Sequence, residues 1–307
     1  MEDNRFSEKR KNLVIGGFTL SCVGSLSGQC AEIPFCGMAF YQPEERISDF
    51  RFHIDSLSPD DKRTLLYGSD DFMFPTFLYQ GETGAYDWIT KKQDGTPALS
   101  FRISPDWTEF TLYDDQTDTK GERAFHEFGS LFSYAVLNHH ACVLHGVVME
   151  YEGKGILITA ASGVGKTTHT RMWRDKERAL ILNGDRCLCR NIEGTWYAYG
   201  MPWSGSSGEY INRRVPIRAI VSLRQAPVNS VRSLSPYEGT IWLLQRIFAP
   251  VWKGNLQNQA FDMTEELAAE IPMLELSCTP DYEAVQVLKT ALTERKILDS
   301  ERTENRI

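Results

Sequence analysis

The sequence predicts an α/β protein with a mixed sheet, preceded by a smaller, mainly antiparallel β domain. Residues 13–112 are a series of short strands separated by turn residues, which is typical of antiparallel sheets. Residues 125–295 instead alternate apolar strands with amphipathic helices. The polar segment Asp114–Glu122 separates the two patterns. We therefore expect an N-terminal domain over 1–120, a second domain over 121–296 and a disordered charged tail over 297–307.

Composition narrows the class of protein. The chain has 307 residues, of which 42% are hydrophobic, enough for two domains with a sizeable core. Its formal net charge of −8 argues against binding nucleic acid or an anionic membrane, and no apolar run is long enough to span a membrane. Glycine and serine interrupt Val14–Gly28 too often for a signal peptide. Seven irregularly spaced cysteines indicate reduced thiols and a cytoplasmic protein.

The N-terminal domain is predicted from five short apolar or alternating segments. We expect strands at 13–22, 50–54, 85–90, 98–103 and 109–113. Asp94-Gly95 and Ser104-Pro105-Asp106 are typical of hairpin turns. The domain is also rich in aromatic residues, which form either a peptide-binding surface or part of the core. They are Phe72, Phe74, Phe77, Tyr79, Tyr86 and Trp88.

A helix and a hairpin open the second domain. Apolar residues at helical spacing predict a helix over 125–138, and the histidines that follow suit the negative end of its dipole. Residues 142–151 read as a strand, which the turn at 151–155 pairs with the next strand as a hairpin. His145, near the start of this strand, is expected to face the loop described next.

The stretch Gly155–Thr168 is the strongest functional signal. Ile156–Thr159 reads as a buried strand, and the small residues after it let backbone N–H groups turn inward towards an anion. A helix then begins, so the stretch matches the Walker A pattern G-x-x-x-x-G-K-[ST], with Ala160 in place of the first glycine. Lys166 would neutralise phosphate charge and Thr167 would offer a hydroxyl to Mg²⁺. The alternative is a glycine-rich turn that only joins strand to helix.

An acidic residue follows the next apolar strand. Residues 179–183 read as this strand, so the Asp185 carboxylate would emerge at the carboxyl end of the sheet, where it can hold Mg²⁺. The alternative is a solvated turn aspartate. Cys187 and Cys189 either share one face of a strand or form half of a metal site, and the absence of a second cysteine pair favours the strand.

The rest of the domain continues the alternation. We expect strands at 196–201, 217–223 and 273–278, and helices at 235–248, at 259–270 and from 281 onward. A capping box at Ser235-Pro236-Tyr237-Glu238 opens the first of these helices. The small-residue loop Pro202–Glu209 either closes over a bound nucleotide or substrate, or is a plain connector.

These motifs resemble those of the HPr kinase/phosphorylase family. The resemblance is carried by Leu144–Val147, by Ile156–Thr167 and by Leu182–Arg186, where that family has two adjacent acids followed by arginine. The more distant ATP-dependent phosphoenolpyruvate carboxykinases share the same loop-then-acid plan. Residues 202–213 resemble HPr-kinase-like proteins found beside ribosomally made, modified peptides. The resemblance covers about 125–295, is absent from 1–120, and implies a P-loop kinase core of the HPr kinase/phosphoenolpyruvate carboxykinase type.

The resemblance also implies roles for individual residues. ATP, or another nucleoside triphosphate, would bind with Mg²⁺, and Thr167 and Asp185 would serve the metal. Eight consecutive residues would hold the nucleotide phosphates: Ala161, Ser162, Gly163, Val164, Gly165, Lys166, Thr167 and Thr168. The catalytic candidates are Asp185, His145 beside the γ-phosphate, Lys166, Glu209 and Arg213.

Gly184 stands where the family has its first acid. Asp185 would then act as both metal ligand and base, or Glu209 would supply the base, or the protein would bind nucleotide without transferring phosphate. Gly184→Asp is expected to raise phosphoryl transfer if the protein is a weakened kinase. His145 either takes part in the chemistry or only hydrogen-bonds the loop backbone.

Two classes of function follow. The first is an ATP-dependent kinase that phosphorylates a hydroxyl, expected to be serine, of a peptide or small protein. The second is a nucleotide-binding regulatory protein without phosphoryl transfer, whose N-terminal domain recognises a partner. A carboxykinase-like enzyme ranks below both, because no oxaloacetate site is recognisable and the chain is short. The expected partners are the nucleotide and a peptide or small-protein substrate, with a homo-oligomer left open.

Overall fold

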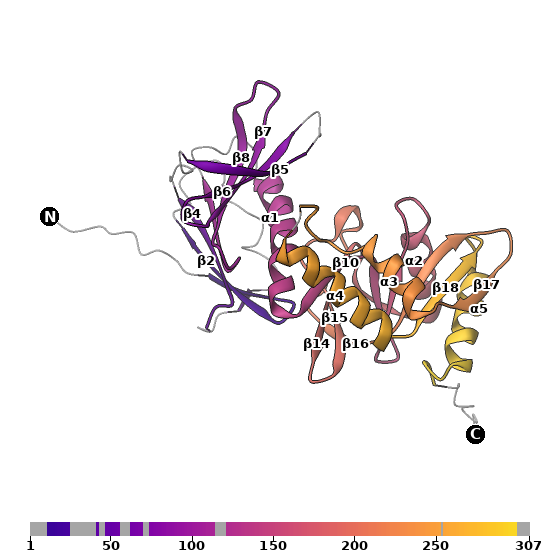
Figure 1. The fold of residues 1–307 in the computed structure, drawn as a ribbon. Coiled ribbons are helices and arrows are strands. Elements are labelled where there is room, and N and C mark those ends of the chain that lie inside the picture. The colour runs from indigo at the N-terminus through magenta and orange to yellow at the C-terminus, as the bar shows by residue number, and fades with distance from the viewer. Residues whose placement is uncertain are drawn as a thin grey trace. The chain divides into compact units, whose positions relative to one another are not determined.

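The chain folds into two compact units. The computed structural model describes residues 11–24, 41–42, 47–55, 62–69, 74–113, 121–252 and 254–299. Unit 1 comprises Met1–Ala135 and Val251–Lys253, and unit 2 comprises Val136–Pro250 and Gly254–Ile307. Helix α1 (Gly121–Ala135) therefore belongs to unit 1 (Figure 1), and the boundary falls after it rather than at residue 120 as the sequence suggested.

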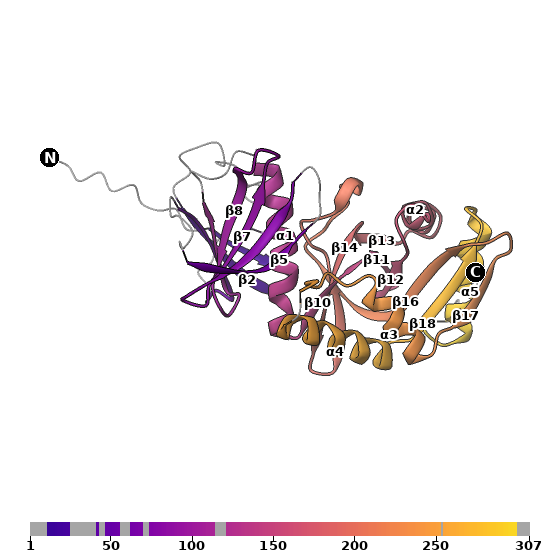
Figure 2. The same ribbon diagram turned by 45° about the horizontal axis from the view of Figure 1, so that its top comes forward.

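Unit 1 is a mainly antiparallel sheet with α1 beside it (Figure 2). Its strands are β1 (Lys11–Ile15), β2 (Phe18–Gly24), β3 (Tyr41–Gln42), β4 (Phe50–Asp55), β5 (Arg63–Gly68), β6 (Thr76–Gly81), β7 (Tyr86–Lys91), β8 (Pro97–Ile103) and β9 (Glu109–Tyr113). Their order is β3-β1-β2-β4-β9-β8-β7-β6-β5. Only β2–β4 and β4–β9 pair in parallel among the described strands, so the predicted antiparallel character is confirmed.

Aromatic rings form the contact between α1 and the sheet. The ring centroid of Phe128 lies 4.9 Å from that of Phe52 and 5.2 Å from that of Phe110. Phe132 lies 5.2 Å from Phe50 in the same way. These phenylalanines are all buried, and edge-to-face pairs of this kind add to the stabilisation from burial. The helix thus completes the core of unit 1.

The aromatic residues that the sequence left open divide between core and surface. Trp88 is buried, whereas Phe74, Phe77, Tyr79 and Tyr86 are half-buried. Cations cover three of the half-buried rings: Arg63 over Tyr79, Lys91 over Phe77 and Arg123 over Phe74. Phe72 lies outside the described residues.

Unit 1 also includes a segment that returns from much later in the chain. The ring of Trp252 lies 5.6 Å from Tyr134, 5.7 Å from Tyr67, 6.0 Å from Trp88 and 6.3 Å from Trp107, measured between centroids. Trp107 and Trp252 are stacked, with 18° between their planes. This aromatic cluster explains why residues 251–253 group with unit 1 and not with their sequence neighbours.

Unit 2 is a mixed sheet with helices on both faces. Its strands are β10 (Ala141–His145), β11 (Val147–Tyr151), β12 (Lys154–Thr159), β13 (Leu180–Asn183), β14 (Arg186–Ile192), β15 (Thr195–Tyr199), β16 (Arg214–Gln225), β17 (Ser230–Ser233) and β18 (Met273–Cys278). The order β10-β14-β15-β16-β12-β11-β13 branches at β16, which also pairs with β18, and β18 with β17. β12–β16 and β16–β18 are parallel and the other described pairs are antiparallel.

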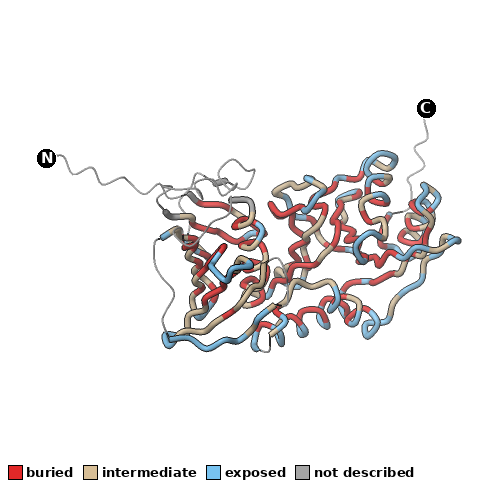
Figure 3. The backbone as a smooth tube through the Cα atoms, turned by 90° about the horizontal axis from the view of Figure 1, so that it is seen from above, coloured by how far each residue is buried: buried red, intermediate tan, exposed pale blue. Residues whose placement is uncertain are grey.

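Successive side chains along the strands point to opposite faces of the sheet, and helices pack on each face. They are η3 (Val136–His139), α2 (Lys166–Glu177), η4 (Gly205–Ser207), α3 (Pro236–Leu244), α4 (Asn255–Glu270) and α5 (Tyr282–Glu294). Ile156 and Ile158 of β12 lie in one core cluster with Trp173 of α2 and Leu288 of α5. On the opposite face, the Trp242 indole of α3 donates to the Thr159 hydroxyl at 2.7 Å. Buried residues, red in Figure 3, occur in both units.

Three predictions about this unit need correction. The strand expected at 142–151 is two strands, because the chain turns at Gly146, where a Cβ would lie 2.9 Å from the Ile158 carbonyl oxygen. The helix expected at 235–248 ends at Leu244, and Ile247 bridges to Leu144 of β10 instead. Ile297 and Leu298 are buried in the core, so the expected tail cannot begin at 297, and residues 300–307 lie outside the described part of the chain.

Candidate active site

A tight loop joins β12 to α2. In this 160–165 loop, Gly163 has φ of 78° and Gly165 has φ of 110°, values that strain any residue with a side chain. Helix α2 begins directly afterwards at Lys166. The N–H groups of Ser162, Gly163 and Gly165 make no hydrogen bond to another described residue. They are therefore free to bind an anion at the positive end of the helix dipole.

Lys166 is the buried cation of this loop. Its ammonium nitrogen donates to the carbonyl oxygens of Ala160 at 2.9 Å and Ala161 at 3.3 Å, and lies 3.0 Å from His145 Nε2. Burial lowers the pKa of Lys166, which the carboxylate of Asp185 opposes and the nearby Arg246 assists. No carboxylate within the described ranges forms an ion pair with this ammonium, so it can turn towards a phosphate.

His145 connects Lys166 to Asp185. Its Nδ1 lies 3.3 Å from Asp185 Oδ1, and its backbone N–H donates to the Arg246 carbonyl at 2.7 Å. An ammonium group only donates, so Nε2 accepts from Lys166 and the ring proton sits on Nδ1, where it points at the carboxylate. The geometry therefore places the imidazole between a cation and an anion.

Asp185 follows β13, as the sequence predicted, and its carboxylate faces His145. Burial on its own would raise the pKa of Asp185, but the hydrogen bond with His145 and the charges of Arg186 and Lys166 lower it below its ordinary value. The side chain is thus a carboxylate at neutral pH. Oδ1 faces His145 Nδ1 and Oδ2 lies 3.9 Å from Arg186 Nε, so each carboxylate oxygen faces a nitrogen of the protein.

Asn183, which sequence reasoning passed over, fixes the position of Asp185. Its buried side-chain oxygen accepts from the backbone N–H groups of Asp185 at 2.8 Å and Arg186 at 2.7 Å. Its amide nitrogen donates to the carbonyls of Met201 at 2.7 Å and Trp203 at 3.2 Å. One amide thereby joins the acid-bearing turn to the loop after β15. The only sequence signal was a polar residue at the end of an apolar strand.

The structure leaves no room for an acid at position 184 as the chain stands. A Cβ built on Gly184 would lie 2.0 Å from Ser207 Oγ and 2.6 Å from Ser207 Cβ. Ser207 in turn donates to the Ser204 carbonyl at 2.6 Å, which holds it there. Gly184→Asp would therefore require Ser207 to move, and whether it raises phosphoryl transfer stays a prediction.

Two of the predicted catalytic residues are engaged elsewhere. Glu209 accepts from Arg174 of α2 at 2.5 Å. Arg213 pairs with Glu150 at 2.7 Å, and Glu150 lies opposite Gly155, at the end of β12 remote from the 160–165 loop. The structure does not bring Arg213 to the group around Lys166. It does place Thr167 and Thr168 in the first turn of α2, where the Thr167 hydroxyl makes no hydrogen bond to the described residues.

A hollow of about 430 Å³ opens beside this group. It is lined by His145, by residues 160–162 of the loop, and by Gln245, Arg246, Ile247 and Phe248. Residues 245–248 were expected on a structural helix, so sequence reasoning did not connect them with this site. They reach the site because the chain leaves α3 and runs along β10, with the Phe248 N–H donating to the Val143 carbonyl at 2.8 Å.

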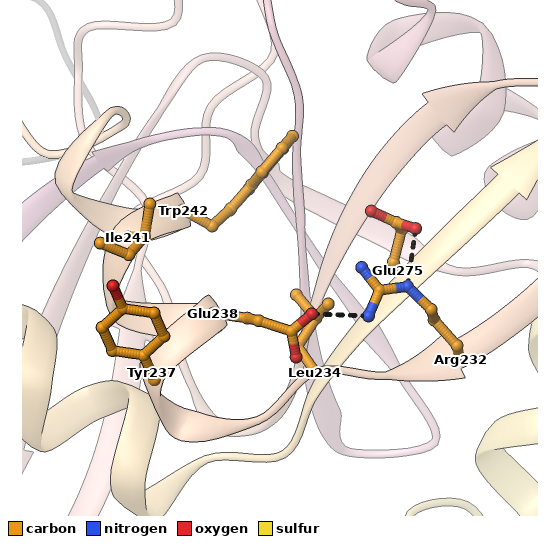
Figure 4. A pocket seen from close by; sticks show the side chains of 7 residues that line it. All are labelled: Arg232, Leu234, Tyr237, Glu238, Ile241, Trp242 and Glu275. Atoms are coloured by element: carbon orange, nitrogen blue, oxygen red, sulfur yellow. Dashed lines mark hydrogen bonds and ion pairs between the residues drawn. The ribbon is translucent and has the colours of Figure 1, made fainter.

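A second hollow, of about 310 Å³, is lined by residues of α3, β17 and β18 (Figure 4). Its one cation, Arg232, donates to Glu275 at 2.9 Å and Glu238 at 2.8 Å. Glu238 also closes the predicted capping box with Ser235. The charges of this hollow are satisfied within the protein, so it offers less to a charged ligand than the first.

Other features of the sequence add no further site. Cys187 and Cys189 are buried on one face of β14 with their sulfurs 3.8 Å apart, as predicted. Within the described ranges, no group of three or more His, Cys, Asp or Glu residues could hold a metal ion. None of the described helices is both long and apolar enough to cross a membrane.

The comparisons with known proteins cover about half of the chain. A solved structure of the Hpr(Ser) kinase/phosphatase from Coxiella burnetii matches at 9% identity with a TM-score of 0.30, over 50% of this chain and 98% of that one. No curated protein matches the sequence. The family model described as SynChlorMet cassette protein ScmC matches residues 130–283, which include the 160–165 loop, His145 and Asp185. Because this match spans half of the chain, the protein belongs to the SynChlorMet cassette protein ScmC family.

Proposed function

We propose that this protein binds a nucleoside triphosphate, ATP in the first instance, with Mg²⁺, and transfers its terminal phosphoryl group to a hydroxyl of a peptide or small protein. One observation carries the proposal: the side chains of Lys166, His145 and Asp185 contact one another in series at the start of α2, beside the free N–H groups of the 160–165 loop. These are the parts that phosphoryl transfer needs, since it depends on positioning and charge neutralisation.

Each of the residues at this site has a distinct task in this proposal. Lys166 and the loop N–H groups would bind the phosphates, and Thr167 and Asp185 would hold Mg²⁺, which shields phosphate charge when bound. A phosphate that draws the Lys166 ammonium to itself would free His145 Nε2 to accept a proton from the acceptor hydroxyl. Asp185 would then stabilise the imidazolium through Nδ1–H. Ser207 fills the space that an acid at position 184 would need, and Arg174 already donates to Glu209. Both acids are therefore poorer candidates for the base.

The first test is nucleotide binding. Titration calorimetry with MgATP should give a measurable affinity for the parent and none for Lys166→Ala, which loses the cation of the loop. Lys176→Ala is the matched control, because Lys176 is an exposed lysine near the other end of the same helix. Equal MgATP affinity in Lys166→Ala and the parent would rule out the assignment of the loop.

A second candidate function is a nucleotide-binding regulator without phosphoryl transfer. It is favoured by Ser207, which fills the space beside Gly184, and by the ion pair that occupies Glu209. Incubation with labelled ATP and peptides encoded beside the protein's own gene separates the two. MgATP binding without any labelled peptide would support the regulator, and labelled peptide that disappears with Lys166→Ala would support the kinase.

A further inference from the structure

Arg246 is a half-buried cation that has no carboxylate partner among the described residues. Its Nη1 donates only to the carbonyl of Gln245 at 3.0 Å and to Gln245 Oε1 at 3.5 Å. Its Nε is buried without any hydrogen-bond partner. Arg232, in the 310 Å³ hollow, is instead held by two carboxylates (Figure 4). A buried donor on a charged group is costly to leave unpaired, so Arg246, unlike Arg232, keeps donor capacity that an anion could use.

The position of Arg246 is fixed from three sides. Its carbonyl accepts the His145 N–H at 2.7 Å, which ties it to the end of β10. The next residue, Ile247, bridges to Leu144 of the same strand. The guanidinium lies 4.5 Å above the Trp242 ring, and the Trp242 indole donates to Thr159, the last residue of β12. Arg246 is thus held in place by the strand that leads into the 160–165 loop.

The charges around Arg246 are unbalanced. Arg246 and His145 line the same hollow as residues 160–162, and Arg246 is near enough to Lys166 to help lower its pKa. Burial lowers the pKa of Arg246 itself. Asp185, whose charge acts on Lys166, faces His145 and Arg186. Two neighbouring cations without an anion between them repel each other, and an incoming anion relieves that repulsion.

We infer that Arg246 forms an anion subsite in the 430 Å³ hollow and binds a phosphate or carboxylate group presented beside Lys166. The inference rests on the proposed function of this site and adds the class of ligand that binds in the hollow. The anion comes either from the terminal phosphate of the nucleotide or from an acidic or phosphorylated group on the acceptor. Arginine suits both, because its planar donors match either oxyanion.

Calorimetry on Arg246→Gln and Arg246→Lys distinguishes the two sources. Each variant and the parent are titrated with MgATP, with MgADP, and with inorganic phosphate after saturation with MgADP. If the anion is the nucleotide's terminal phosphate, Arg246→Gln should weaken MgATP binding by about 10-fold or more and leave MgADP unchanged. If it belongs to the acceptor, phosphate binding to the MgADP complex should weaken by about the same factor while MgATP is unchanged.

Arg218→Gln is the matched control. Arg218 is exposed on β16 beside Ile217, which pairs with Gly155 at the end of β12 remote from the loop. It should bind all three ligands like the parent. Arg246→Lys keeps the charge but loses the planar donors, so it should recover only part of the affinity and carries the test if Arg246→Gln does not fold.

Arg246→Gln within twofold of the parent in all three titrations would overturn the inference. A parent that binds neither nucleotide would instead refute the proposed function, and inorganic phosphate titrated into the nucleotide-free protein would then decide on Arg246 alone. Phosphate binding lost in Arg246→Gln would still support the subsite, and no phosphate binding by the parent would refute it as well.

Discussion

The side chain of Asn183 shows how much of the site depends on single backbone contacts. Asn183→Asp keeps the size and the accepting oxygen but loses the donors to the Met201 and Trp203 carbonyls. Two buried carbonyls without donors should lower the free energy of unfolding by about 2–4 kcal/mol. Urea unfolding measures this, with the exposed Asn258→Asp of α4 as control. Equal stability of the two variants would mean that Asn183 does not organise the turn.

Asp185 is the residue where metal binding and folding can be separated. Asp185→Asn keeps the side chain's shape but removes the charge that a hard cation requires. We expect the Mg²⁺ dependence of nucleotide binding to be lost, while the unfolding midpoint shifts little, since His145 can still donate to the amide oxygen. Nucleotide titrations with and without Mg²⁺ test this. An unchanged Mg²⁺ dependence would leave Asp185 as a turn residue.

Gly184 and Ser207 should behave as a coupled pair. Gly184→Asp alone should destabilise the loop over Asp185, because its Cβ overlaps Ser207. Combining it with Ser207→Gly removes the overlap and should restore most of the lost stability. Thermal unfolding of both single variants and the double variant gives the coupling. Additive effects in this cycle would contradict the close packing of the two residues.

The sequence located the residues whose roles follow from neighbours in the chain. Lys166, His145 and Asp185 meet in the structure, since each stands at a fixed offset from the end of a strand. Whether these residues bind and react as predicted remains a prediction. The partners of Glu209 and Arg213 were out of reach, because each depends on a residue far away in sequence that carries no local signal.

Among the elements, α2 carries a pH-sensitive contact. His169 Nε2 accepts from the Trp173 indole at 3.1 Å, and burial lowers the pKa of His169 to about 4. The unfolded chain, with a pKa near 6.5, takes up the proton first, so stability is full above pH 6.5 and falls as the pH drops towards 4. The loss from this group should reach about 2 kcal/mol at pH 5.

Urea unfolding at pH 7 and pH 5 isolates this effect. His169→Gln should lose less stability than the parent between the two pH values, by about the amount given above. His126→Gln, at an exposed position of α1, should behave like the parent. If His169→Gln and the parent lose the same stability, protonation of this histidine does not cause the loss of stability between pH 7 and pH 5.

Element prediction succeeded where local pattern and tertiary pairing agree. β18 and the capped start of α3 lie where the sequence put them. β5 and β6 were not predicted, because β5 is an exposed edge strand without apolar alternation. The break at Gly146 was missed because both sides of it are apolar, and only the close approach of Ile158 shows why the chain turns there.

At the scale of the whole molecule, Trp252 ties a late segment into unit 1. Trp252→Ala should lower the free energy of unfolding of that unit by about 2–4 kcal/mol, because four aromatic neighbours lose their contact. Thermal unfolding followed by near-ultraviolet circular dichroism reports on these rings. Val251→Ala is the control, since Val251 is 67% exposed. An unchanged unfolding transition of unit 1 in Trp252→Ala would contradict the role of the cluster.

The return of Trp252 also has a consequence for the order of events during translation. The strands and helix of unit 1 leave the ribosome first, but the ring that completes their aromatic cluster is made only after most of the sheet of unit 2. At ordinary elongation rates this delay is about ten seconds. The nascent unit 1 must keep Tyr67, Trp88, Trp107 and Tyr134 without their partner for that time. A chain that stalls before Trp252 therefore presents an incomplete unit 1 to chaperones and proteases.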